Sequence, residues 1–377
     1  MRVYFVGLGG AGARIVDRIH QIHADRSFVH AVACFDTDRT TLDGLESVPA
    51  DRRHRFGDGV DGPGLVGDIE RGFALGTDHA TELCRELDAG RPGTAEAFLL
   101  VTGLGGGTGG GATPALAAEL THLYEHPVYA FGVLPGPPDR DPLVTDHAAF
   151  QSGPDKQRAG DSTDATRATA AIRSLDRLEG AVDAIIGFDS AAWLRSGESM
   201  PAATGRLNDI IAERIAATFA DPDGETASQR VIDAADIGRI LGRDGTYATI
   251  GYAEQEVIEE QSRFGLGLFS TTQDVDTSSA IQAVEVVTRK ATRGKQTATP
   301  GIVQPSRALL VVGGPPAWLI RSAIADGRAW LADELDVEEL LSGDRPNPDT
   351  TAVFATVVRA GLDSLPRIET LRTRATV

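Results

Sequence analysis

The chain contains very little lysine and no long apolar run. Its 36 basic residues include only three lysines, Lys156, Lys290 and Lys295, and 54 acidic residues bring the formal net charge to -18. Nucleic acid and anionic lipid are attracted by positive potential, so the composition argues against both as nonspecific partners. The acid excess is typical of a protein solvated in concentrated salt; a GC-rich genome would explain the lysine shortage but not the acid excess.

Other scarcities narrow the class of protein further. Two cysteines, Cys34 and Cys84, cannot support a disulfide framework, and no charged-then-apolar leader opens the chain. No segment approaches the roughly 20 apolar residues that span a bilayer, so we expect a cytoplasmic protein without direct membrane insertion. His20 and His23 lie three residues apart, but nothing nearby completes a metal set, which leaves any metal ligands unknown.

The apolar periodicity predicts an α/β protein with two cores. Strands are expected at residues 2–6, 29–35, 97–101, 128–134 and 182–188, and helices at 14–20, 112–124, 163–178 and 204–219. This alternation predicts a doubly wound parallel sheet. Residues 135–162 lack periodicity and are expected to form an acidic loop. Further strands (247–252, 308–312, 352–358) and helices (280–292, 317–335) predict a smaller α/β domain, which gives three parts: residues 1–202, a long central helix at 203–222, and residues 223–377.

A first glycine-rich segment follows the first expected strand. Gly7, Gly9 and Gly12 satisfy G-x-G-x-x-G, and Asp36 ends the second expected strand, where an acidic residue would bind a ribose hydroxyl in a dinucleotide fold. This motif alone is compatible with a nicotinamide or flavin enzyme, with another nucleotide-binding protein, or with a tight turn.

A second glycine-rich segment, residues 105–111, consists of six glycines around Thr108. Glycine amides and the threonine hydroxyl are suited to holding phosphate at a helix N-terminus. No lysine follows as in a P-loop, and a flexible linker fits badly between a strand and a helix. Two such segments predict one nucleotide held from two sides.

The second segment resembles the G-G-G-T-G-[ST]-G signature of the tubulin/FtsZ superfamily of GTP-dependent filament proteins. Residues 8–12, 36–38, 62–70 and 207–209 resemble that family's other nucleotide-contacting segments in the same order. Residues 231–237 resemble its N-x-D-x-x-D synergy loop, and residues 308–316 and 327–331 are most similar to the CetZ branch of salt-loving archaea.

The resemblance implies a tubulin/FtsZ fold, bound GTP or GDP with Mg2+, and self-assembly head to tail, with other tubulin/FtsZ-like proteins as further partners and a role in cell shape. It implies that Asp233 and Asp236 act on the nucleotide of the next subunit. The nucleotide-binding residues that it implies are Gly9, Gly10, Ala11, Gly12, Arg14, Asp36, Gly62, Gly64, Gly105, Gly106, Gly107, Thr108, Gly109, Asp139, Arg167, Ser190 and Asn208.

Three positions depart from the family pattern. Val231 replaces the asparagine that opens the synergy loop, Ser190 replaces a guanine-facing asparagine, and Thr204 replaces an aromatic residue. Because valine cannot hydrogen-bond, a regulatory pseudo-GTPase that binds nucleotide and modulates other filaments is an alternative to a filament-forming GTPase. A dinucleotide oxidoreductase would explain the first glycine segment but would leave the second one, Asp233 and Asp236 without a role.

Overall fold

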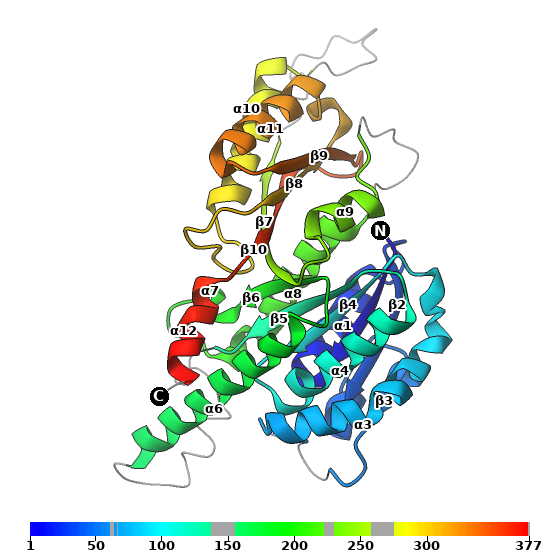
Figure 1. Cartoon of the computed structure of the whole chain (residues 1–377). Coiled ribbons are helices and arrows are strands. Elements are labelled where there is room, and N and C mark those ends of the chain that lie inside the picture. The colour runs from blue at the N-terminus through cyan, green and yellow to red at the C-terminus, as the bar shows by residue number, and fades with distance from the viewer. Residues whose placement is uncertain (61–63, 66, 137–154, 222–229, 258–274, 376–377) are drawn as a thin grey trace.

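A single ten-stranded sheet runs through the whole molecule (Figure 1). The computed structural model describes the chain except residues 61–63, 66, 137–154, 222–229, 258–274 and 376–377. Neighbouring strands follow the order β3-β2-β1-β4-β5-β6-β7-β10-β8-β9. Their bounds are β1 Val3–Leu8, β2 Val29–Asp36, β3 Arg53–Arg55, β4 Ala97–Gly103, β5 Val128–Leu134, β6 Ala184–Asp189, β7 Thr246–Glu256, β8 Arg307–Gly314, β9 Glu339–Pro346 and β10 Ala352–Leu362.

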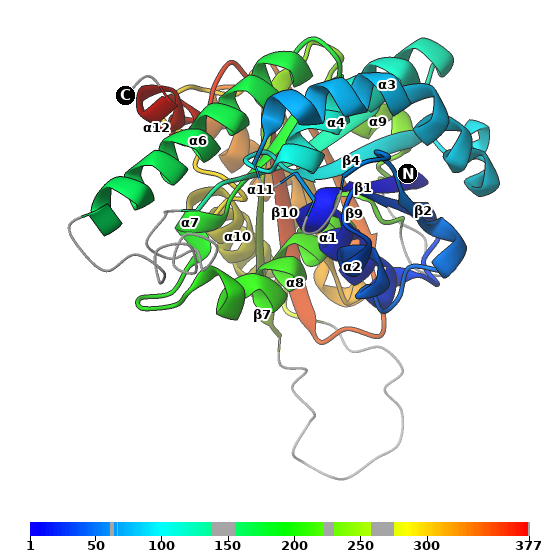
Figure 2. The same ribbon diagram turned by 90° about the horizontal axis from the view of Figure 1, so that it is seen from below.

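The first seven strands in this order are parallel, and β1, β4, β5 and β6 are buried on both faces. Figure 2 shows helices α3 (Ile69–Leu87), α4 (Gly107–Leu123) and α6 (Asp155–Leu178) on one side of the sheet, and α1 (Gly9–His23), α2 (Arg39–Asp43) and α8 (Met200–Phe219) on the other. Strand β4 shows the alternation that such layers require, because Phe98 and Leu100 enter one core while Leu99 and Val101 enter the other. The predicted doubly wound sheet is confirmed.

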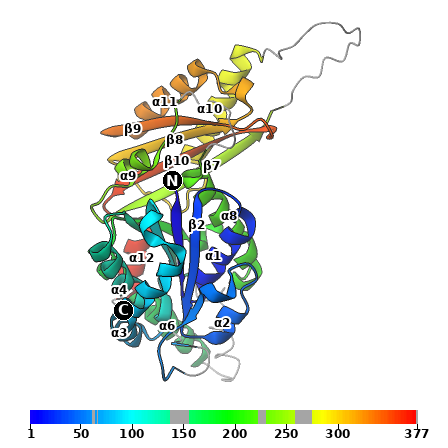
Figure 3. The ribbon, with the colours of Figure 1, turned by 90° about the vertical axis from the view of Figure 1, so that its right-hand side faces the viewer.

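The second half of the chain extends the same sheet. Strand β7 pairs in parallel with β6 and antiparallel with β10, which joins the C-terminal strands to the N-terminal half. Helices α10 (Thr277–Arg293) and α11 (Arg321–Leu335) cover one face of these strands, and α9 (Ala234–Leu241) lies on the other (Figure 3). Helix α7 (Ser190–Trp193) follows β6, and α12 (Pro366–Ala375) follows β10.

Several expected boundaries were wrong. Helix α4 begins at Gly107 rather than at residue 112, because glycines that look like a loop form its first turn. Helix α6 begins at Asp155, so the expected loop does not extend to residue 162. Helix α9 begins at Ala234, within the segment 231–237 that resembles the synergy loop. The sequence reading also missed α3, β9 and α12. None of the described helices is long and apolar enough to cross a bilayer.

Candidate functional site

Helices α1 and α4 begin side by side at the carboxyl ends of β1 and β4. Gly9 adopts a φ of 69°, and a Cβ built on it would lie 2.7 Å from the backbone nitrogen of Gly109. The first turns of the two helices are therefore in direct backbone contact. The first N–H groups of a helix have no intrahelical partner, so both helices direct free donors and positive dipole ends toward the same region.

Most glycines at the start of α4 are required by packing. A Cβ on Gly109 would lie 2.6 Å from the Leu8 carbonyl oxygen, and one on Gly110 would lie 2.5 Å from that of Leu104. Gly111 faces Gly72 of α3, where its Cβ would approach the backbone to 2.4 Å. By contrast, Gly106 is exposed, and its Cβ would find no atom closer than 3.4 Å. Ligand binding is therefore not needed to explain Gly109, Gly110 or Gly111.

Thr108 joins α4 to the end of β2. Its hydroxyl lies 2.8 Å from that of Thr37, and both side chains are buried. A Cβ on Gly64, which has a φ of 79°, would lie 2.9 Å from the Thr37 hydroxyl, so the segment before α3 reaches the same point. When Thr37 donates in this pair, the Thr108 proton remains available to a ligand oxygen. Thr37 was missed as a functional residue although it lies in the recognised 36–38 segment.

Asp36 and Arg14 provide opposite charges beside these helix starts. Asp36 is 3% exposed, and burial raises its pKa to about 6, while backbone hydrogen bonds and Arg14 act in the opposite direction. Arg14 is exposed, and its guanidinium lies over Gly10 in the first turn of α1. An anion at this turn would meet a cation as well as the helix dipole.

The remaining predicted nucleotide residues differ from one another in burial and in hydrogen bonding. Arg167 of α6 is half-buried, and its carbonyl oxygen lies 3.4 Å from a Cβ built on Gly105. Ser190 is buried and donates a 2.8 Å hydrogen bond to the Leu134 carbonyl. Asn208 is half-buried on α8, and its amide has no hydrogen-bond partner among the described residues. Gly62 and Asp139 lie outside the described residues.

Asp233 and Asp236 form a capping box at the start of α9. One oxygen of Asp233 accepts a 2.8 Å hydrogen bond from the Asp236 backbone nitrogen, and one oxygen of Asp236 accepts from the Asp233 nitrogen at 3.4 Å. Both residues therefore have a helix-capping role. Each carboxylate has a second oxygen that the cap does not use, so capping does not prevent either from contacting water.

Strand β9 and strand β8 hold α9 in place. The Arg230 backbone nitrogen donates to Asp344 at 2.6 Å, and the Asp344 nitrogen donates to the Arg230 carbonyl at 3.1 Å. At the other end of α9, the Arg307 guanidinium donates to the carbonyls of Ile240 and Leu241. The two aspartates are thus fixed by the C-terminal half of the sheet.

The glycine segments and the two aspartates lie at opposite ends of the parallel strands. A cavity of about 570 Å³ separates α9 from Glu96 and Pro127, which immediately precede β4 and β5. The glycine segments follow the carboxyl ends, and the seven residues of β4 span about 20 Å. Figure 1 shows α9 beside the N-terminus, where β1 begins. Within one molecule, the two groups cannot act on the same ligand atom.

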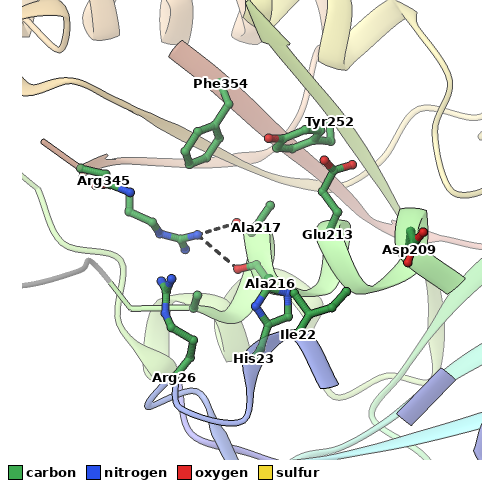
Figure 4. Close-up of a pocket in the computed structure, with 12 residues that line it drawn as sticks. Ile22, His23, Arg26, Asp209, Glu213, Ala216, Ala217, Tyr252, Arg345 and Phe354 are labelled. Carbon is green, nitrogen blue, oxygen red and sulfur yellow. Dashed lines mark hydrogen bonds between the residues drawn. The ribbon is translucent and has the colours of Figure 1, made fainter. Parts of the chain in front are cut away.

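A separate cleft of about 370 Å³ opens at the junction of the two halves (Figure 4). It is lined by α1, α8 and the C-terminal strands and lies away from the glycine segments. Arg345 enters it and donates to the carbonyls of Ala216 and Ala217 near the end of α8. This contact ties β9 to the central helix.

Comparisons with known proteins match the whole chain. Residues 2–152 match the family model described as Tubulin/FtsZ family, GTPase domain, and residues 197–377 match Tubulin-like CetZ, C-terminal domain. Tubulin-like protein CetZ5 of Haloferax volcanii is 31% identical over all of this chain and 91% of its own length. This chain belongs to the CetZ family of the tubulin/FtsZ superfamily.

Solved CetZ structures share the fold along the full length. The GDP-bound monomer of CetZ1 from Haloferax volcanii aligns with a TM-score of 0.81 at 29% identity, covering 100% of this chain and 99% of its own. The GTPγS-bound protofilament of CetZ2 from the same organism gives 0.80 at 27%, covering 100% and 98%. The predicted tubulin/FtsZ fold and CetZ resemblance are confirmed, and the first glycine segment belongs to a GTPase-type domain rather than to a dinucleotide enzyme.

Proposed function

We propose that this CetZ-family chain binds GTP and GDP at the carboxyl ends of β1 and β4, and that it assembles head to tail with hydrolysis between subunits. The observation that carries the proposal is the separation of the glycine segments from Asp233 and Asp236 at opposite ends of the strands. Contacts between unlike faces generate filaments when the rotation between subunits does not close a ring. The GDP-bound and protofilament CetZ structures support this assignment.

In this proposal, phosphate oxygens accept hydrogen bonds from the first N–H groups of α1 and α4. Gly105 and Gly106, the less constrained glycines, let the backbone approach the phosphates, and Thr108 donates from the centre. Arg14 and Arg167 supply positive charge.

Other residues contact the remaining parts of the nucleotide in this proposal. Gly62 and Gly64 contact the γ-phosphate, and Asp36 and Asp139 contact the ribose. Asn208 reads the guanine edge, with the buried Ser190 shaping that pocket rather than reading the base, since its hydroxyl is bonded to Leu134. Mg2+ would be held largely by phosphate oxygens and water.

Hydrolysis in this proposal uses the oxygens that the α9 cap leaves available. Asp233 is exposed and Asp236 half-exposed on the face that would meet the next subunit. Each could orient and polarise a water molecule against the neighbouring γ-phosphate. The cap fixes both carboxylates before assembly, which lowers the entropy cost of placing them.

A regulatory pseudo-GTPase remains the second candidate. Val231 is 54% exposed on this face, where the family asparagine would offer an amide. An apolar side chain there is suited to a contact between subunits but not to orienting a water molecule. The two candidates predict different dependence of phosphate release on protein concentration. In either case we propose a cytoplasmic role, with cell-shape control as the process for a filament.

Mixing two variants tests hydrolysis between subunits. Asp233→Asn keeps the capping acceptor but removes the carboxylate, and we expect turnover to fall about 10²–10⁴-fold with GTP affinity unchanged. Gly106→Asp places a carboxylate at the exposed N-cap of α4, which should block phosphate binding without disturbing the fold. Each variant alone should be inactive, whereas a 1:1 mixture should recover about one quarter of the wild-type rate, because a quarter of random interfaces combine both intact halves.

The readout is phosphate release in molar KCl at several protein concentrations, with pelleting measured alongside. Restoration in the mixture supports a shared site. A mixture that stays inactive while both variants still assemble rules out Asp233 as the residue acting between subunits. Wild-type protein that binds GTP but releases phosphate at no concentration would instead favour the pseudo-GTPase.

A further inference from the structure

The C-terminal helix α12 returns to the nucleotide-binding half of the molecule. It lies alongside α6 (Figure 1), and Ile368 and Leu371 are buried in the same core as the apolar face of α6. Arg372 adds an ion pair to Asp176 of α6 at 3.2 Å. The last helix of the C-terminal half is therefore packed onto a helix that borders the glycine segment.

Arg367, in the first turn of α12, reaches the carboxyl edge of the parallel sheet. Its guanidinium donates a 2.8 Å hydrogen bond to the Pro135 carbonyl, and its Nε lies 3.7 Å from a carboxylate oxygen of Asp189. Pro135 directly follows β5, and Asp189 ends β6. The Arg367 and Asp189 side chains are only 14% and 12% exposed, so their interaction is poorly screened by solvent.

Both Pro135 and Asp189, the two partners of Arg367, adjoin predicted nucleotide residues. A Cβ built on Gly105 would lie 3.2 Å from Pro135 Cβ, so Pro135 packs directly against the second glycine segment. Asp189 caps α7 by accepting from the Ala191 nitrogen, and the next residue, Ser190, donates back to Leu134. Arg367 thus bridges the two segments that flank the phosphate and base ends of the proposed site.

We propose that Arg367 is a positioning residue that holds Pro135 and Asp189 in the geometry required for guanine-nucleotide binding, so that the C-terminal helix controls nucleotide affinity. This inference rests on the proposed nucleotide site. The link runs through α12 and does not involve the central helix α8. Nucleotide exchange is therefore sensitive to how α12 is docked.

Removal of Arg367 would leave two groups without their partner. The Pro135 carbonyl would lose its donor, and Asp189 would become a buried carboxylate without a nearby cation. Burial already raises the pKa of Asp189, and Arg367 partly opposes this. Without Arg367, the pKa of Asp189 would rise further, and its ionised form would distort the start of α7.

The test compares Arg367→Gln with Arg367→Lys and with Arg372→Gln, which removes an exposed ion pair of the same helix. The probe is a fluorescent GDP analogue titrated into the full chain in molar KCl. We expect Arg367→Gln to weaken affinity about tenfold, Arg367→Lys to recover part of the loss, and Arg372→Gln to have no effect. At saturating GTP, the turnover of Arg367→Gln should match that of the wild type, because Asp233 lies on the other face.

A pH series and a second-site variant separate positioning from general damage. The affinity loss of Arg367→Gln should become smaller as pH is lowered, since protonation of Asp189 removes the uncompensated charge. Adding Asp189→Asn should restore affinity for the same reason. Unchanged affinity in Arg367→Gln, or an equal loss in Arg372→Gln, would overturn the inference. The proposed function is tested separately by wild-type affinity for guanine nucleotide, whereas Arg367 is judged by the ratio of variant to wild type.

Discussion

At the carboxyl edge of the sheet, four chain segments meet around Thr108, whereas at the amino edge one short helix presents Asp233 and Asp236. The first region is built from backbone in direct contact, with glycines where a Cβ would collide with a carbonyl. The second region is built from side-chain hydrogen bonds at an exposed helix start. The proposed binding face is therefore preorganised by packing. The opposite face depends on a few polar contacts, each of which a single substitution can remove.

The largest expected effect concerns the packing glycines. Gly111→Ala places a methyl group 2.4 Å from the α3 backbone at Gly72, so α3 and α4 must separate. We expect the free energy of unfolding to fall by about 1–3 kcal/mol, measured by thermal unfolding in molar KCl. Gly106→Ala is the control, because its methyl group would make only an ordinary van der Waals contact, 3.4 Å from the Gly103 carbonyl oxygen: stability should be unchanged while nucleotide affinity falls. Equal stability losses in both variants would show that the glycine segment is uniformly strained.

These glycines also explain what the sequence could and could not predict. The signature at 105–111 correctly predicted the family and its fold, but glycine runs are typical of loops, so the first turn of α4 was missed. The partner surface was missed with it: Gly72 and Gly76 form a G-x-x-x-G pattern on α3 that packs against α4. That pattern was visible in the sequence. It indicates close helix packing only when a second helix lies against it, and local periodicity does not predict which helices are neighbours.

The amino-edge residues were predicted from the resemblance alone and not from their local environment. Asp233 and Asp236 were identified from the N-x-D-x-x-D spacing, although the same spacing also forms a capping box. The anchoring contact between Arg230 and Asp344 joins positions more than a hundred residues apart. Strand β9, which carries Asp344, ends in polar residues and has no apolar alternation, so periodicity did not predict it.

The next prediction concerns the charge buried at the binding face. The pKa of Asp36 is raised by burial from 3.8 to about 6, so the folded state binds more protons than the unfolded state between these values. Its stabilising contribution is therefore complete below pH 3.8 and is lost as pH rises through 6, by at most about 1.4 kcal/mol per pH unit. Asp36→Asn should abolish this component of the pH dependence, measured as the difference in unfolding free energy from wild type between pH 4 and pH 7.

Asp38→Asn provides a control of opposite sign for that measurement. Burial of Asp38 is outweighed by hydrogen bonds from Thr41 and Thr40, so the net effect lowers its pKa. Asp38 therefore stabilises the fold above its ordinary pKa, and this contribution is lost as pH falls. If Asp36→Asn changed the pH dependence of the unfolding free energy in the same direction as Asp38→Asn, the Asp36 carboxyl would be ionised and paired in the free protein.

The smallest expected effect tests the polar anchoring of the amino edge. Asp344→Ala removes the acceptor of the Arg230 nitrogen but keeps the backbone hydrogen bond between the same residues. Loss of one such bond lets the segment before Asp233 move, and we expect assembly-dependent phosphate release to fall about fivefold. Affinity for a fluorescent GDP analogue should be unchanged, because the binding face is about 20 Å away along β4. Asp349→Ala, an exposed carboxylate beyond the same strand, should alter neither quantity. If Asp344→Ala weakened nucleotide binding as much as turnover, the two edges would be mechanically coupled through the sheet and would not be independent halves of a shared site.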